Sequence, residues 1–230
     1  MKKIILFSLL CAWAIVMDAQ PRIWYVSSTG NMFHGDSWNL PCTFEYALLN
    51  AQYGDQIWVK QGNYTIAPQI INTSIKIYGG FSGWEGDVNE RFQSGLLYST
   101  INMDVNFIGT NPLIWVNTDP YQLGQCDSSL SFFTLDGFIL SDAETDFRNN
   151  WGGALRADSI KNLTLNNLVV SFCIASDGGG MYLNNILHGW MENVLFYGNF
   201  ATNLGGGLFL SYCTDFTMVN TAFTTNNIAY

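Results

Sequence analysis

The sequence predicts an all-β chain folded as a parallel β-helix, a solenoid in which ~27-residue coils stack on one another. The C-terminal half repeats at a fixed step of that length, and its apolar runs are short and broken by Gly and Asn. Charged residues make up only 12% of the chain, whereas hydrophobic residues make up 48%. A disordered chain shows the opposite balance, so disorder is excluded.

Residues 1–19 are typical of a signal peptide. Two lysines follow Met1, residues 4–16 are apolar, and Ala19 offers the small residue expected before a cleavage site. A short membrane anchor is the alternative, while lipidation of Cys11 is disfavoured because Leu10 precedes it. We therefore expect export to the cell surface or the extracellular space. No later apolar run reaches the roughly 18–20 residues of a membrane-spanning helix, so none is expected in the mature chain.

The charge of the chain argues against nucleic-acid binding. The formal net charge is −9, and loss of Lys2, Lys3 and Asp18 with the signal peptide leaves 7 basic against 17 acidic residues, or −10. Such a surface repels phosphate backbones. We therefore expect no nucleic acid among the partners.

Four cysteines remain after the signal peptide, namely Cys42, Cys126, Cys173 and Cys213. An exported chain can keep disulfides, and four cysteines allow three pairings among which the sequence cannot choose. Buried free thiols are an equally good interpretation. The spacing matches no zinc pattern, and the chain lacks a nucleotide-binding glycine fingerprint. No metal or cofactor is therefore expected.

Residues 20–130 are expected to hold an N-terminal cap and the first coils. A strand is predicted at 22–27, and Thr43 is placed to cap a short helix with Phe44 and Ala47 on its apolar face. Further strands are predicted at 56–60, 75–78 and 113–116. The open end of a solenoid exposes both its core and a strand edge. The short helix is therefore expected to cover the first coil.

Residues 131–230 carry the regular repeat. The segments 152–155, 179–182 and 206–209 begin with paired glycines and recur at a constant step of 27. Asn166, Asn193 and Asn220 follow the same step. One coil earlier, 133–140 resembles 163–170 at a step of 30, which predicts a longer corner there. Short apolar runs between Gly and Asn indicate strands and turns rather than paired helices.

The repeated asparagines are expected to be structural. Strands in neighbouring coils lie ~4.8 Å apart, so equivalent side chains stack in columns. Asn tolerates the left-handed backbone conformation of a tight corner and can hydrogen-bond to the Asn above it. The sequence ends just before the next glycine pair would come. We expect a fragment of a longer protein or, alternatively, end-to-end contact with a partner through an open C-terminal coil.

A series of motifs follows the chain at 23–26 (IWYV), 35–38 (GDSW), 51–58 (AQYGDQIW), 62–65 (GNYT), 78–83 (YGGFSG), 90–91 (ER) and 135–138 (LDGF), together with the three glycine repeats. In this order the motifs resemble exported right-handed parallel β-helix proteins of the polymorphic outer-membrane-protein type, which are common in Bacteroidetes. The resemblance covers roughly residues 22–230. It implies a right-handed β-helix at or outside the cell surface, but β-helices include lyases, glycosidases and non-catalytic surface proteins.

The repeat step also suggests where a site would lie. It places Lys161, His188 and Asp215 in one column, so that Asp215 could orient His188 as a general base. A second column would hold Asp158, Asn185 and Tyr212. Trp190 follows shortly after His188, and Trp190 and Tyr212 could offer faces to a sugar. The alternative is a solvated face on which unlike charges simply avoid repulsion.

The sequence thus predicts an exported surface module with a structural or adhesive role and no catalysis of its own. The alternative is a carbohydrate-active β-helix protein that binds a polysaccharide or cleaves it as a lyase or glycoside hydrolase. Surface glycans or other surface proteins are the expected partners.

Overall fold

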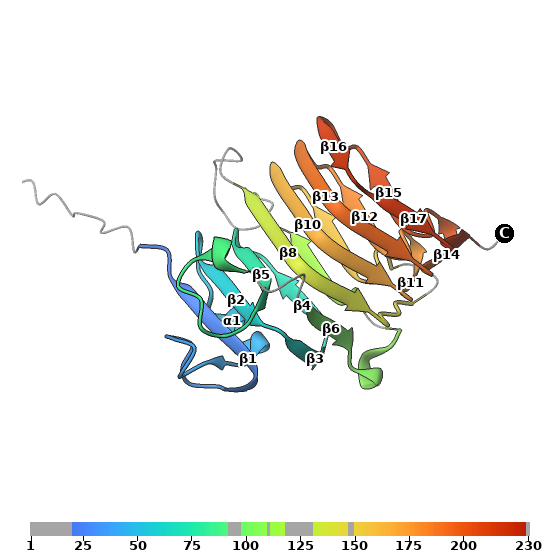
Figure 1. Cartoon of the computed structure of the whole chain (residues 1–230). Coiled ribbons are helices and arrows are strands. Elements are labelled where there is room, and N and C mark those ends of the chain that lie inside the picture. The colour runs from blue at the N-terminus through green and yellow to red at the C-terminus, as the bar shows by residue number, and fades with distance from the viewer. Residues whose placement is uncertain (1–19, 92–97, 110, 118–130, 147–149, 229–230) are drawn as a thin grey trace, which may run out of the picture.

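The computed structural model describes residues 20–91, 98–109, 111–117, 131–146 and 150–228. In these residues the chain is mostly β, and its strands form long parallel sheets (Figure 1). This arrangement is compatible with the predicted parallel solenoid. Among the same residues, no helix has the length and apolar character needed to cross a membrane.

A ten-stranded parallel sheet, here called the long sheet, runs through the described chain. Its main path joins strands from both halves of the sequence, and in Figure 1 β8, β10, β13 and β16 lie side by side. The strands of that path are β1 (Ile23–Asn31), β2 (Gln56–Lys60), β5 (Lys76–Phe81), β8 (Phe132–Ser141), β10 (Asn162–Ser171), β13 (His188–Tyr197) and β16 (Phe216–Val219); β3 (Gly62–Ile66), β6 (Ser99–Met103) and β17 (Ala222–Thr224) pair beside it.

Two smaller sheets are also parallel. The five-stranded sheet consists of β4 (Gln69–Ile71), β7 (Ile114–Asn117), β9 (Leu155–Asp158), β12 (Met181–Asn184) and β15 (Leu208–Ser211). The three-stranded sheet consists of β11 (Ile174–Asp177), β14 (Phe200–Leu204) and β18 (Asn227–Ile228). The short helical elements are α1 (Phe44–Asn50), η1 (Val88–Glu90) and η2 (Val105–Phe107). The strands predicted at 22–27, 56–60, 75–78 and 113–116 are confirmed with small shifts at their ends.

The strand register confirms one predicted step and corrects another. Leu163 pairs with Phe133, which is the predicted step of 30. However, Leu163 pairs on its other side with Gly189, a step of 26 rather than 27. The next step, from Gly189 to Phe216, is 27 as predicted. A register shift in β14 takes up the additional residue, because Ala201 pairs at a step of 26 and Leu204 at a step of 27.

Alternation along the strands separates the core from the surface. In β10, Leu163 and Leu165 are buried whereas Asn162 and Thr164 are partly or fully exposed. The buried positions stack from strand to strand, and each such side chain contributes roughly 1.5–3 kcal/mol through burial. One core column follows the long sheet through Trp24, Ile57, Ile77, Leu135, Leu165 and Met191. The next residue in this column, Met218, is exposed.

Helix α1 forms where the sequence predicts it. The Thr43 hydroxyl accepts a hydrogen bond from the Tyr46 N–H at 3.2 Å and so satisfies one of the free donors of the first turn. Phe44 and Ala47 are buried, and the helix packs against β1 and β2. The ring of Tyr46 meets Trp24 edge-on at 6.1 Å.

A buried ion pair attaches the segment after β5 to the long sheet. The Arg91 guanidinium donates to the Asp136 carboxylate at 2.9 Å and to the Gly79 carbonyl at 3.0 Å. The second carboxylate oxygen of Asp136 accepts from Asn167 at 2.8 Å. Glu85, also buried, accepts three backbone N–H bonds, which hold the pKa of its carboxyl below the ordinary value although burial opposes this.

An asparagine ladder marks one corner of the long sheet. It consists of Asn167, Asn193 and Asn220, all with positive φ, and not of Asn166 as the repeat step predicts. The Asn193 amide donates to Asn167 at 3.2 Å, and the Asn220 amide donates to Asn193 at 2.5 Å. The predicted structural role of these asparagines is therefore confirmed, with the first member shifted by one position.

Candidate functional site

The structure brings together His188 and Asp215, as the sequence predicts. His188 begins β13, and Asp215 immediately precedes β16 in the next coil. The His188 Nδ1 atom lies 2.7 Å from a carboxylate oxygen of Asp215, and the two side chains are 49% and 73% exposed. The pair is therefore readily accessible from solvent.

Lys161 does not share this column. The residue beside His188 on β10 is Asn162, because the step between these strands is 26. Only the Lys161 carbonyl reaches His188, where it accepts the backbone N–H at 2.8 Å. The predicted order of cation, imidazole and carboxylate is thus wrong, and an amide takes the place of the cation.

Trp190 lies on the same outer face as His188. It is 42% exposed, stands between Thr164 and Thr217 of the neighbouring strands, and donates its indole N–H to Glu192 at 3.1 Å. A shallow hollow of about 380 Å³, here called the groove, is lined by Asn162, Thr164, His188, Trp190, Asp215 and Thr217. Asn162, Thr164 and Thr217 were not predicted as lining residues. With the correct strand register they would have been, because Asn162 pairs with His188 and the two threonines pair with Trp190.

The second predicted column forms only in part. Asn184 pairs with Ser211, so Asn185 and Tyr212 align at the predicted step of 27, but Asp158 does not join them. Asp158 stacks beside Asn184 and not Asn185, because the register is shifted by one position here too. The Asp158 carboxylate is nearly buried, and it accepts from the Trp115 indole at 2.8 Å and the Arg156 guanidinium at 2.6 Å. These bonds give Asp158 a structural role on the five-stranded sheet.

Asn185 and Tyr212 occupy a tight corner instead. Both have positive φ, as does Ser159, whose hydroxyl accepts from the Asn185 amide at 3.2 Å. Tyr212 is 86% exposed. These two residues share a column, as predicted, with Ser159 in place of Asp158, and they do not line the groove.

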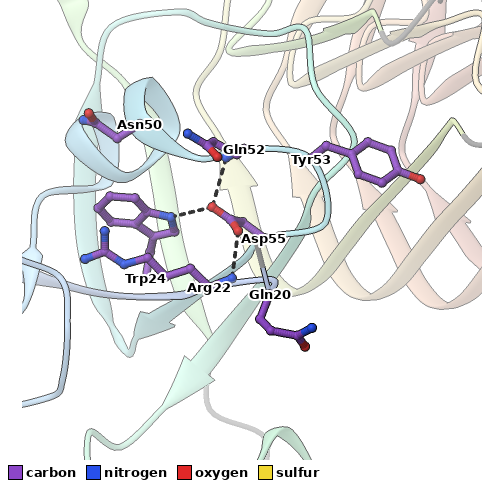
Figure 2. Close-up of a pocket in the computed structure, with 7 residues that line it drawn as sticks. All are labelled: Gln20, Arg22, Trp24, Asn50, Gln52, Tyr53 and Asp55. Carbon is purple, nitrogen blue, oxygen red and sulfur yellow. Dashed lines mark hydrogen bonds between the residues drawn. The ribbon is translucent and has the colours of Figure 1, made fainter. Parts of the chain in front are cut away.

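A second hollow lies where α1 leads into β2 (Figure 2). It is called the corner pocket here, has a volume of about 410 Å³, and was not predicted. Its lining consists of Gln20 and Arg22 just before β1, Trp24 in β1, Asn50 at the end of α1, and Gln52, Tyr53 and Asp55 in the α1–β2 connection.

Asp55 fixes the wall of the corner pocket. Its carboxylate accepts from the Arg22 backbone N–H at 2.8 Å, the Trp24 indole at 3.0 Å and the Gln52 backbone N–H at 2.9 Å, as Figure 2 shows. The Arg22 guanidinium lies 3.6 Å above the Trp24 ring and forms an ion pair with Asp36. Tyr53 points away from Arg22 and Trp24.

The cysteines offer no site in the described residues. Cys42, Cys173 and Cys213 are free thiols, which decides between the two predicted states for these three, while Cys126 lies outside the described residues. Burial raises the pKa of Cys42 to about 11 and that of Cys173 to about 12. Both thiols are therefore neutral and poor nucleophiles at physiological pH. Within the described part of the chain, no three His, Cys, Asp or Glu side chains gather as a metal site.

Comparison with known proteins identifies no relative. No protein-family model matches the chain, and neither a curated protein nor a solved structure matches it. What the protein does must therefore be inferred from its residues and their geometry.

Proposed function

We propose that this chain is an exported right-handed parallel β-helix that acts at the cell surface or outside the cell as a structural or adhesion module without catalysis of its own. The observation that carries this proposal is the continuous register of parallel strands in the long sheet. Stacked coils of this kind present extended surfaces to partners. The predicted signal peptide and the resemblance to surface β-helix proteins support the location.

Helix α1 is proposed to cap the first coil. Phe44 and Ala47 are fully buried, and the helix packs on β1, the strand at the edge of the long sheet. An uncovered strand edge invites pairing with other chains. The cap therefore keeps the first coil from aggregating.

The location is tested by following the full chain in a Gram-negative host. We expect a mature N-terminus at Gln20 and digestion of the chain by proteinase K added to intact cells. Leu9→Arg breaks the apolar part of the signal peptide and is expected to leave the chain inside the cell. Retention of the unaltered chain in the cytoplasm would contradict the proposal.

The second candidate function is carbohydrate binding at the groove, and the His188–Asp215 pair beside Trp190 favours it. Polar groups next to an exposed aromatic ring suit a sugar, which has both hydroxyls and apolar faces. With Nδ1 protonated and donating to Asp215, Nε2 of His188 is an acceptor that could take a proton from a hydroxyl. The groove therefore offers binding, with general-base catalysis as an additional role for His188.

Binding and catalysis are separated by three variants. Trp190→Ala is expected to lower glycan binding at least tenfold on a glycan array and by calorimetry. His188→Gln keeps a polar side chain and removes the base, so it is expected to abolish any cleavage while largely preserving binding. Phe172→Ala removes an exposed ring that does not line the groove and serves as the control. Glycan binding that Trp190→Ala leaves unchanged would overturn this function.

A further inference from the structure

The groove and the corner pocket both lie at the end of the long sheet at which its strands begin. We propose that they are two ends of a single track that binds one extended, neutral glycan chain. This inference rests on the proposed carbohydrate binding at the groove. It adds a second subsite, the orientation of the glycan chain across the strands, and a minimum length for the ligand.

The strand register connects the two hollows. Phe132, Asn162 and His188 are paired neighbours on β8, β10 and β13, and all three face outward. On the other side of Phe132, its backbone N–H donates to the Ser74 hydroxyl at 3.1 Å, and the Ser74 carbonyl accepts from Gly54 at 2.9 Å. Gly54 lies in the α1–β2 connection that forms the corner pocket.

Tyr53 joins the pocket to this column. It lines the corner pocket, is 47% exposed, and meets the Phe132 ring edge-on at 5.6 Å. Figure 2 shows its ring turned away from Arg22 and Trp24. Tyr53 thus lines the pocket while its ring lies against Phe132, on the outer face that leads to the groove.

The length of the track follows from the strand spacing. Four steps separate β2 from β13 along the path β2, β5, β8, β10 and β13. At ~4.8 Å for each step, the pocket and the groove are roughly 19 Å apart. A ligand that touches both must be a chain of several sugars lying across the strands.

The side chains between the hollows suit sugar hydroxyls. A second outward column next to the first holds Lys76, Thr134, Thr164, Trp190 and Thr217. Tyr53, Phe132 and Trp190 place aromatic rings near the start, the middle and the far end. Amides and hydroxyls stand between these rings. Alternation of flat rings with neutral hydrogen-bonding groups is the chemistry that a polysaccharide requires.

The charges favour a neutral ligand. In the corner pocket, Arg22 is paired with Asp36, and the Asp55 carboxylate is engaged by three donors. Lys76 stands 5.8 Å from the Phe132 ring and forms no ion pair within the described residues, so the track carries one cation there. The net charge of −10 that remains after loss of Lys2, Lys3 and Asp18 opposes approach of a polyanion.

The test measures binding of unbranched neutral β-1,4-linked glucan and mannan oligosaccharides of two, four, six and eight sugars to residues 20–230. Affinity is expected to increase at least tenfold between the two-sugar and the longer ligands. Tyr53→Ala in the pocket and Trp190→Ala in the groove should each remove most of that increase. Phe172→Ala is the matched control, because it removes an exposed ring away from both hollows.

The outcomes distinguish the track from the groove alone. If Trp190→Ala weakens binding of every ligand and Tyr53→Ala weakens none, carbohydrate binding stands and the track is overturned. If affinity does not depend on length, the two hollows are independent and the track is again overturned. If none of these oligosaccharides binds and the glycan array shows no binding that depends on Trp190, both the track and carbohydrate binding at the groove fall. Circular dichroism of each variant checks that the fold is kept.

Discussion

Phe196 and Phe223 are paired neighbours on the parallel strands β13 and β17, yet their environments differ completely. Their rings stack at 4.8 Å with an angle of 3° between the planes, but Phe196 is fully buried and Phe223 is 50% exposed. The same contrast separates Met191, which is buried, from Met218 beside it. Side chains on β13 are covered by paired strands on both sides, whereas those on β16 and β17 are covered by β13 on one side. The place of a strand in the sheet therefore decides what its side chains contribute to stability.

This pair of phenylalanines should give the greatest difference in stability. Phe196→Ala leaves a cavity in a packed core and is expected to lower the free energy of unfolding by about 3–5 kcal/mol. Phe223→Ala is expected to cost less than about 1.5 kcal/mol, because half of the side chain is already in solvent. Urea denaturation of the two variants measures the difference. Equal losses would show that the last described coil is as well packed as the interior ones.

Ion pairs extend the comparison to charged groups. The side chains of Arg91 and Asp136 are 7% and 11% exposed, whereas His188 and Asp215 are largely exposed. Arg91→Met leaves the Asp136 carboxylate buried without its cation and is expected to cost about 3–5 kcal/mol. His188→Ala is expected to cost at most about 1 kcal/mol, because solvent screens the pair. Partial recovery in Arg91→Met/Asp136→Asn would assign the loss to the unpaired charge, and no recovery would assign it to packing.

The reactivity of two cysteine thiols gives a further comparison between buried and partly exposed side chains. Burial raises the pKa of Cys173 to about 12, and it also raises the pKa of the half-buried Cys213. At pH 8 we expect Cys173 in the native protein to react with a thiol reagent about tenfold or more slowly than Cys213. Mass spectrometry of the labelled peptides measures both rates. Faster labelling of Cys173 would place it in solvent.

The raised pKa of Cys173 also sets a direction for stability. The folded state favours the neutral thiol, so the stabilising effect is complete below the ordinary thiol pKa of 9.0. It is lost as the pH rises from about 9 to about 12. Urea midpoints at pH 8 and pH 10.5 should therefore fall more for the unaltered chain than for Cys173→Ala. An equal fall would assign the loss to other groups.

The asparagine ladder should give the least difference of the set. Asn193 is bonded to Asn167 on one side and Asn220 on the other, so Asn193→Ala loses both bonds and places Ala at positive φ. We expect a cost of about 1–2 kcal/mol, and about half of that for Asn220→Ala. Asn193→Gly tolerates the backbone and removes only the amide, so it should recover part of the loss. Thermal denaturation of the three variants tests this order.

Much of the fold could be predicted from local patterns. Short apolar runs between glycines predict β2 and β5, Thr43 predicts the start of α1, and the step of 30 between Phe133 and Leu163 is confirmed. The His188–Asp215 contact was also predicted, because the step of 27 between these coils is regular. Short-range chemistry and an undisturbed repeat are enough for features of this kind.

The register of the preceding coil could not be predicted in the same way. A pair of glycines at 152–153 can align with a run of three at 178–180 in two ways, and the sequence does not favour one. The structure aligns Gly152 with Gly178, and both have positive φ. The step from β9 to β12 and from β10 to β13 is therefore 26, so each residue pairs one position away from its predicted partner. Lys161 is thereby replaced by Asn162, and Asp158 is separated from Asn185.

Local conformational preference and periodicity are properties of the sequence, and they specify the β class, the repeat, the short helix and the type of residue at each corner. The exact register, the shift within β14 and the meeting of residues 20–24 with residues 50–55 at the corner pocket emerge only when the coils pack together. Packing of the strands against one another decides these features. A register shift by one residue costs little within a single strand, but it changes the cross-strand partner of every side chain on that strand.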